Sequence, residues 1–381
     1  MTSFVVKNCR AVLPESVMED AVVRVEEGTI VEISRGREPV AGLDAQGAWL
    51  LPGLVDMHSD AIEKAVEPRP NARFPTEVAL RELDRCLAAW GVTTIFHSLS
   101  FADMEIGLRS NGMAAALIDE VVELSPRLRV DTRIHARFEV TDLEAVTHLR
   151  RLVAERKIEL LSFMDHSPGQ GQYRDVAAYK AFYGKTYAMS DSDLDKVLER
   201  KTAAKENGVF RAMEEMAALC REHGVAMASH DDDSDERIQW CLREGVAMSE
   251  FPINLGTARA AKAAGIRTCL GAPNLVRGGS QAGNLKALTA VEDGCADILC
   301  SDYLPQSLVH AVFLLHASGV LSLPQAVAMA SLAPARATGM GDVAGSIELG
   351  KRADLVLVKV RHGLPDVVRT WSRGNEVYAS C

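Results

Sequence analysis

The feature that most constrains the fold is an alternation of short apolar stretches and longer amphipathic ones, from about residue 52 to residue 340. Amphipathic segments such as TEVALRELDRCLAAWG have the spacing of apolar residues that is typical of surface helices. Between them lie eight segments expected to be strands: GLVDMHSD, TTIFHSLSF, TRIHARFEV, IELLSFMDH, VAMASHD, AMSEFPI, RTCLGAPN and ADILCSDY. Eight such units predict an α/β fold, a (β/α)8 TIM barrel with its active site at the carboxyl ends of the strands. A doubly wound open sheet is the alternative.

Both ends of the chain contain short strand-like segments. Residues 1–51 include FVVKNCRAVL and AVVRVEEGTIVEI, and residues 345–381 include GSIELGKRADLVLVKV and VVRTWSRGNEVYAS. Neither end is long enough to form a stable sheet by itself. We therefore expect the two ends to pair in a small β-sandwich domain, with residues 52–344 forming the barrel domain.

One connection is too long for a plain strand-to-helix unit. Residues 167–224 follow the fourth predicted strand and carry aromatic and basic side chains. Such an insertion is often a lid or part of a substrate pocket. The alternative is a helical excursion without a role in function.

Charge and hydropathy exclude some classes of partner. The net charge of −10 argues against nucleic acid as the main partner, although an acidic protein can still bind an anionic substrate in a local basic pocket. No apolar run approaches the 18 residues of a membrane span, and the N-terminus lacks the pattern of a signal peptide. The eight cysteines form no CxxC pair. These observations predict a cytoplasmic protein with reduced thiols.

His and carboxylate side chains stand where several predicted strands end. His58 and Asp60 are two residues apart, so their side chains share one face at the end of the first strand. On the third strand the odd-numbered residues share a face, which puts Glu139 at the barrel mouth. His166 ends the fourth strand and His230 the fifth.

Asp302 ends the eighth strand and completes a set of six donors from five strands. Any one of them alone would more often be a packed or surface residue. Because strand ends of a barrel meet at one mouth, the whole set predicts a divalent metal site. His and carboxylate ligands suit Zn, Mn, Fe or Ni, and the absence of cysteine from the set disfavours a structural zinc site.

Three further residues near the strand ends are weaker candidates for a direct role in the site. His97 ends the second strand, where a packed core residue is the more common outcome and a substrate contact the less common one. Asp56 and His135 lie deeper on inward faces and are expected to support the site rather than to bind metal.

The chain resembles the amidohydrolase superfamily across nearly its whole length, through LPGLVDMHSD near the start and GSIELGKRADLVLV near the end. Members usually end the first strand in His-x-His, whereas this chain has His58-Ser59-Asp60. The added negative charge is better placed near two cations than near one. More narrowly, HSDAIEKAVEPRPNARFP, SFMDHSPGQGQY, ASHDD and GAPNLVRGGSQAGN resemble the diphosphatases of phosphonate breakdown that act on α-D-ribose 1-methylphosphonate 5-triphosphate.

This resemblance implies a binuclear metal centre. His58, Asp60 and Asp302 would hold one cation, and His166 and His230 a second, with Glu139 bridging the two. Zinc is the expected metal, with manganese, iron or nickel as alternatives. Water activated there would attack the α-phosphorus of the triphosphate, and Asp302 is the best candidate to accept its proton.

A phosphorylated sugar needs cationic and amide donors around its phosphates. Candidates fall in the loop after the first strand, in the glycine-rich turn after the seventh strand and at the start of the long insertion: Lys64, Arg69 and Arg73; Arg277, Gly278, Gly279 and Ser280; Gln170 and Gln172, with Arg174. A glycine-rich turn alone is a weak signal, because without the resemblance a plain loop without a binding role is about equally expected.

Two other functional classes stay open. A C–N hydrolase, such as a cyclic amidase or deaminase, would use the same fold and an activated water. A neutral ring substrate carries no negative charge for the basic loops to bind. The basic loops therefore favour the diphosphatase. A non-catalytic scaffold fits poorly with six intact donor positions. A homodimer is expected only from the general prevalence of symmetric dimers.

Overall fold

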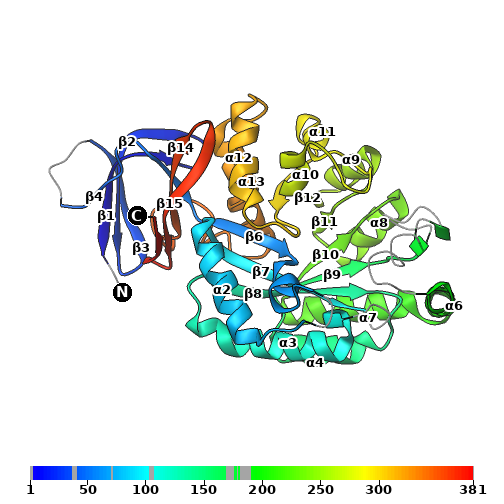
Figure 1. Ribbon diagram of the computed structural model, residues 1–381. Coiled ribbons are helices and arrows are strands. Elements are labelled where there is room, and N and C mark those ends of the chain that lie inside the picture. Colours follow the sequence, from blue (N-terminus) through cyan, green and yellow to red (C-terminus); the bar gives the residue numbers. More distant parts are fainter. Residues whose placement is uncertain are drawn as a thin grey trace.

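A computed structural model describes residues 3–36, 41–69, 72–102, 107–168, 176–177, 179–180 and 190–380. It contains a large parallel barrel and a separate sheet built from both chain ends (Figure 1).

The barrel consists of eight strands that are hydrogen-bonded in sequence order, each neighbouring pair being parallel. The strands are β6 (Leu54–Ser59), β7 (Val92–Phe101), β8 (Asp131–Glu139), β9 (Leu160–Met164), β10 (Ala226–His230), β11 (Met248–Glu250), β12 (Arg267–Gly271) and β13 (Ile298–Cys300). The barrel closes just beyond β13, where Asp302 donates its backbone N–H to His58 O at 2.9 Å and accepts from the N–H of Asp60. All eight predicted strands are confirmed, and the closure rules out the open sheet.

Helices cover the outside of the barrel (Figure 1). They are α1 (Ala61–Val66), α2 (Thr76–Ala89), α3 (Asn111–Leu124), α4 (Ala145–Ala154), α7 (Val209–His223), α8 (Asp235–Glu244), α9 (Leu255–Ala263), α10 (Ala272–Arg277), α11 (Ala287–Glu292), α12 (Ser307–Ala317), α13 (Leu323–Met329) and α14 (Leu332–Ala337), with 3-10 turns at Gly107–Arg109 and Ser125–Arg127. In α2 the residues Leu80, Leu83 and Leu87 recur at helical spacing and are buried against the strands. The apolar stripe of each helix therefore supplies the outer half of the core.

The barrel interior holds a second apolar cluster, which includes Val55, Phe96, Ala228, Met248 and Cys269. Successive side chains of a strand point to opposite faces, so each strand feeds both clusters in alternation. The inward cluster fills the barrel below its mouth and leaves the polar strand ends above it.

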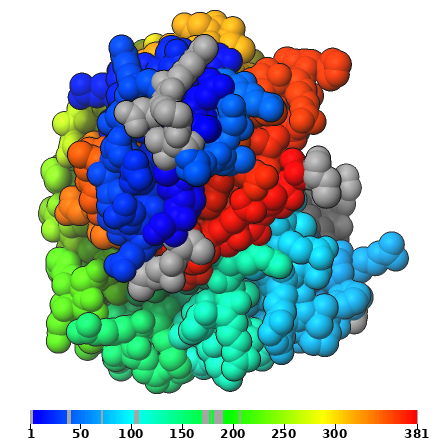
Figure 2. Space-filling view, turned by 90° about the vertical axis from the view of Figure 1, so that its left-hand side faces the viewer, coloured from blue at the N-terminus to red at the C-terminus, as the bar shows by residue number. Residues whose placement is uncertain are grey.

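The terminal sheet joins the two chain ends, as predicted. Its strands are β1 (Phe4–Val12), β2 (Val17–Glu26), β3 (Thr29–Arg35), β4 (Leu43–Asp44), β5 (Trp49–Pro52), β14 (Leu355–Arg361), β15 (Leu364–Ser372) and β16 (Asn375–Ala379). The antiparallel pairing of β5 with β14 unites the N-terminal and C-terminal segments, which lie side by side in Figure 2. The hydrogen bonding forms one continuous sheet. Phe4 of β1 stacks on Trp371 of β15 with ring centroids 5.2 Å apart, so the sheet encloses its own core.

The chain passes from the terminal sheet into the barrel at Gly53. An added Cβ there would lie 2.1 Å from Thr93 Oγ1, so only glycine fits between the two sheets. Arg352 ties the sheets together nearby, because it donates to Asp354 at 2.6 Å, to Asp131 at 2.8 Å and to Thr94 Oγ1 at 3.1 Å. The division into separate domains at residues 51/52 and 344/345 remains a prediction.

The described part of the long insertion contains α6 (Asp191–Asn207) and leads into α7. Ser190 caps α6 by accepting the backbone N–H of Asp193 at 3.2 Å. Lys205 of α6 contacts Asp165 at the end of the fourth barrel strand at 3.0 Å. The helix thus lies next to the mouth of the barrel, where a lid was predicted.

The seven described cysteines are all free, and six of them are buried. Within the described ranges, none of the helices combines the length and the apolar character needed to cross a membrane.

Candidate active site

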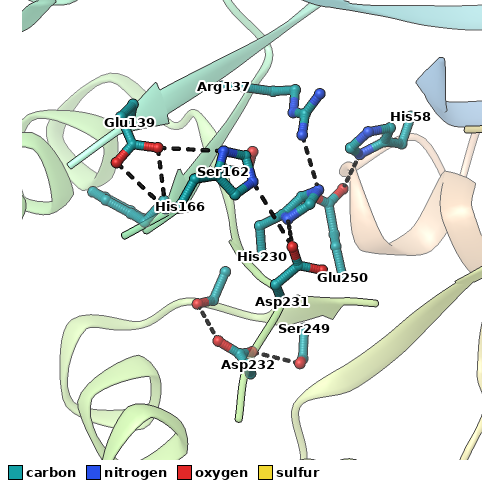
Figure 3. Close-up of polar contacts among 12 residues, drawn as sticks. His58, Arg137, Glu139, Ser162, His166, His230, Asp231, Asp232, Ser249 and Glu250 are labelled. Atoms are coloured by element: carbon teal, nitrogen blue, oxygen red, sulfur yellow. Dashed lines mark hydrogen bonds and ion pairs between the residues drawn. The ribbon is translucent and has the colours of Figure 1, made fainter. Parts of the chain in front are cut away.

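Side chains from the ends of several barrel strands meet at the mouth of the barrel (Figure 3). Three groups of potential metal donors occur among the described residues, and the donor atoms within each group lie within 4.8 Å of one another: His58, Asp60 and Asp302; His166, His230 and Asp231; His58, His230 and Glu250. Five of the six predicted ligands belong to these groups. The sequential strand order also puts Glu139, His166 and His230 at the third, fourth and fifth strands, as counted from the sequence.

The first group joins the two edges of the barrel closure. His58 is fully buried, and its Nε2 atom lies 3.8 Å from Oδ1 of Asp60. Burial, reinforced by the charge of Asp60, raises the pKa of Asp302 to about 6. Asp302 has a φ of 57°, a conformation that costs free energy in a residue other than glycine and is common at functional sites.

The second group differs from the predicted one because it contains Asp231. The Oδ2 atom of Asp231 lies 3.3 Å from Nδ1 of His230 and 3.8 Å from Nε2 of His166. Its φ of 55° turns the chain sharply after the fifth strand, which carries the carboxylate back to the mouth. The run of three aspartates after His230 was the sequence signal for this residue, but the run does not reveal which carboxylate turns inward.

Glu139 belongs to none of the three donor groups found in the described parts of the chain. Its Oε1 atom lies 2.8 Å from Nζ of Lys201 and accepts a hydrogen bond from Thr141 Oγ1 at 2.6 Å. Its Oε2 atom accepts the backbone N–H of His166 at 3.2 Å. Burial raises the pKa of Glu139, but Lys201 and His166 outweigh that effect and hold it far below its ordinary value. The predicted bridging role of Glu139 stays a prediction.

Glu250, at the end of the sixth strand, was not predicted. It is fully buried, and its Oε1 atom lies 3.0 Å from Nδ1 of His58. Burial raises the pKa of Glu250, but His58 and His135 overcome that effect and lower it to about 2. The signal in the sequence was a glutamate inside the predicted strand segment AMSEFPI, and the structure makes this residue the last of β11.

Arg137 supplies a positive charge at the centre of the site. Its Nη1 atom donates to both carboxylate oxygens of Asp60, at 3.1 and 3.2 Å, and its Nη2 atom lies 3.0 Å from Nε2 of His230. A buried guanidinium in this position can bind an anionic group entering the mouth. Its inward face was apparent from the alternation on the third strand, but its role was not predicted.

The supporting residues occupy the positions expected of them. Asp56 accepts the backbone N–H of Ser301 at 3.0 Å. His135 lies between Ser98 and Ser162, with its ring nitrogens 3.0 and 2.9 Å from their hydroxyl oxygens. Both residues brace neighbouring strands.

A pocket of about 560 Å³ opens over these groups. Of the predicted substrate-binding residues, Arg277, Gly279 and Ser280 line it. The lining does not include the described residues Lys64, Arg69, Arg73 and Gly278, and Arg73 instead contacts Glu67 at 3.4 Å. Gln170 and Gln172, with Arg174, lie outside the described residues.

Two arginines that were not predicted to bind substrate, Arg109 and Arg137, also line the pocket. Arg109 donates through Nε to Glu63 at 3.1 Å. The pocket therefore combines acidic donors at its base with three arginines, an arrangement suited to cations below and an anionic ligand above.

The donors fit a divalent cation. The Nε2 atom of His58 is buried and has no hydrogen-bond partner among the described residues, although a buried polar atom normally has one. It faces the carboxylates of Asp60 and Asp302, a mixed nitrogen and oxygen set that suits Zn, Mn, Fe or Ni.

Comparisons with known proteins agree with this arrangement. The sequence model of the amidohydrolase family matches residues 185–379. The alpha-D-ribose 1-methylphosphonate 5-triphosphate diphosphatase of Escherichia coli (strain K12) is 33% identical over 380 residues, which cover 98% of this chain and 100% of that protein. An L-hydantoinase of Paenarthrobacter aurescens is 30% identical over 139 residues, 35% of this chain and 27% of that protein. The solved structure of N-acetylglucosamine-6-phosphate deacetylase from Pasteurella multocida covers 100% of both chains with a TM-score of 0.67 at 12% identity, which shows a shared fold.

Proposed function

Because the chain belongs to the amidohydrolase family, whose members are metal-dependent hydrolases, we propose that it removes pyrophosphate from α-D-ribose 1-methylphosphonate 5-triphosphate in phosphonate breakdown. The observation that carries this proposal is the 33% identity to a diphosphatase of that activity over 98% of the chain. A relationship that spans both sheets and all eight barrel strands includes every loop at the barrel mouth, where substrate specificity arises in this fold.

We propose two cation positions, the first held by His58, Asp60 and Asp302 and the second by His166 and His230. Zinc is the metal we expect, with manganese, iron or nickel as alternatives. When bound, such cations polarise a phosphoryl oxygen and make water more acidic.

Asp302 is the residue we assign to proton transfer. It lies next to Asp60 at the barrel closure and lines the pocket. Water attacks the α-phosphorus in line with the departing group, and Asp302 accepts the proton that the water loses. A bond forms between the water oxygen and the α-phosphorus as the bond to the bridging oxygen breaks. The products are pyrophosphate and the 5-monophosphate.

The three arginines of the pocket would hold the phosphate oxygens. Arg137 and Arg109 lie on the side of Asp60, and Arg277 lies at the end of α10, where its Nη1 atom donates to the hydroxyl of Tyr303 at 3.3 Å. Phosphoryl transfer depends mainly on positioning and on neutralising charge, which is the work that such side chains do.

The alternative is a C–N hydrolase, such as a cyclic amidase or deaminase. Its support is the relationship to the L-hydantoinase, which covers only 35% of the chain. A neutral ring would bring no anionic group to the three pocket arginines, so this alternative is weaker.

Phosphorus NMR of the metal-loaded protein with α-D-ribose 1-methylphosphonate 5-triphosphate tests the proposal. We expect pyrophosphate and a 5-monophosphate to appear with the wild type and to be absent with Asp302→Asn. Asp293→Asn is a matched control, since Asp293 pairs with Arg259 on the surface and does not line the pocket. An unchanged triphosphate, together with hydrolysis of a hydantoin or dihydropyrimidine, would establish the C–N hydrolase instead.

A further inference from the structure

Two buried histidines of the site each have a glutamate carboxylate beside Nδ1 (Figure 3). His58 has Nδ1 at 3.0 Å from a carboxylate oxygen of Glu250 and Nε2 at 3.8 Å from Asp60. His166 has Nδ1 at 3.3 Å from a carboxylate oxygen of Glu139 and Nε2 at 3.8 Å from Asp231. In each case one carboxylate faces Nδ1, and Nε2 faces a second carboxylate in the donor group.

This arrangement is the one by which proteins orient histidine ligands. A carboxylate that accepts the N–H of Nδ1 fixes the tautomer, so the lone pair is on Nε2 and points at the metal. Glu250 acts in this way on His58, and Glu139 stands in the equivalent place beside His166.

Glu139 is itself held by a residue of the long insertion. Lys201 of α6 reaches the barrel mouth, where its ammonium group lies 2.8 Å from Glu139 and donates to Thr141 Oγ1 at 3.3 Å. Lys201 is only 4% exposed. A buried lysine is stable only when it is paired, so this contact anchors the helix as well as the carboxylate.

Both oxygens of Glu139 have contacts within the protein, and Glu139 belongs to none of the three donor groups among the described residues. Oε1 receives Lys201 and Thr141, and Oε2 receives the backbone N–H of His166. Asp231 is the carboxylate that the chain turns toward both His166 and His230.

We propose that Lys201 is a positioning residue for the second cation position. It fixes Glu139, Glu139 orients His166, and Asp231 rather than Glu139 completes the donor group with His166 and His230. Docking of the insertion helix and retention of the second cation are therefore coupled. The inference rests on the proposed metal-dependent function and assigns the insertion a part in it.

Metal binding without substrate tests this inference. The full-length apoprotein would be titrated with Co²⁺ against a chromophoric chelator, with visible absorption recorded for each equivalent and the melting temperature measured in parallel. The variants are Lys201→Met, Lys201→Arg as the conservative replacement, Asp231→Asn and Glu139→Gln. Lys196→Met is the matched control, because Lys196 is on the same helix and pairs with Asp193 at its surface.

We expect the wild type and Lys196→Met to bind two equivalents of Co²⁺. Lys201→Met should bind the first equivalent unchanged and the second about 10- to 100-fold more weakly, as is usual when an outer partner of a histidine ligand is lost. Lys201→Arg should restore most of that affinity. Glu139→Gln should weaken the second equivalent by a similar factor, and Asp231→Asn should abolish it.

Three results would overturn the inference: wild-type affinity for both equivalents in Lys201→Met, equal weakening of both equivalents, or loss of both in Glu139→Gln, as for a bridging ligand. A wild type that binds fewer than two equivalents would also overturn it. Pyrophosphate release is measured separately. If the expected Co²⁺ pattern appears without that activity, the proposed substrate is wrong and the role of Lys201 stands.

Discussion

His97 was predicted to end the second barrel strand, but β7 continues to Phe101, and His97 faces away from the site. It shares its face of β7 with Ile95 and Leu99, which belong to the outer core cluster between strands and helices. The side chain is 1% exposed, and neither ring nitrogen has a hydrogen-bond partner among the described residues. Burial lowers the pKa of His97 to about 3. Replacement by leucine should therefore change how stability depends on pH.

The sign and size of this pH dependence follow from the linkage between protonation of His97 and unfolding. The unfolded chain protonates this histidine near pH 6.5, whereas the folded chain resists protonation until about pH 3. The free energy of unfolding thus has its full value above the unfolded pKa and falls as the pH drops from 6.5 toward 3. Between pH 8 and pH 5 the wild type should lose about 2 kcal/mol through His97 alone. This figure changes little for any folded pKa below about 4, because the unfolded state then dominates the difference.

Urea unfolding at pH 8 and pH 5 measures the effect. His97→Leu should lose about 2 kcal/mol less than the wild type between these pH values, since all other titrating groups are common to both proteins. At pH 8 the variant should also be more stable by about 1–3 kcal/mol, because two unpaired buried nitrogens are removed.

His316→Leu is the control, because it makes the same replacement at an exposed histidine on α12. Parallel losses of stability in the wild type and His97→Leu would refute the reasoning and show that the buried imidazole is solvated or paired.

Three further predictions concern the metal, the junction and the ion pairs. Chelation should abolish hydrolysis, and added Zn²⁺ should restore it, as followed by pyrophosphate release; activity that survives complete metal removal would contradict the proposed centre. Gly53→Ala should lower the free energy of unfolding by about 2 kcal/mol or more, because the new methyl group collides with Thr93, whereas alanine at the open position Gly112 should cost far less in the same urea assay. Arg352→Met should cost about 3 kcal/mol, since Asp354 is buried and loses its ionic partner, while Arg361→Met, on an exposed pair, should cost under about 1 kcal/mol.

The local pattern of apolar and polar residues was sufficient to predict the architecture. Strand and helix periodicities are local properties, so all eight barrel strands and the pairing of the two chain ends could be predicted. The positions of His58, Asp60 and Asp302 could also be predicted, because a residue at the carboxyl end of a parallel barrel strand lies at the barrel mouth.

The site atoms were harder to predict because their distances depend on neighbours remote in sequence. Asp231 reaches the donor group through a turn with positive φ, and Lys201 meets Glu139 only because the insertion helix docks at the mouth. The loop with Lys64, Arg69 and Arg73 has the charge that a phosphate site needs, but its described side chains lie outside the pocket.

The sequence by itself was sufficient to place five of the predicted ligands at the barrel mouth, since their positions depend on the alternation of each strand and on the parallel order: His58, Asp60, His166, His230 and Asp302. The tertiary structure alone decided which of them face one another. Glu250 beside His58, and Lys201 with Glu139 beside His166, result from packing between separate strands and helices, which no periodicity along the chain encodes. Contacts of about 3 Å depend on backbone turns and side-chain rotamers that become fixed only when the barrel closes and the insertion packs against it.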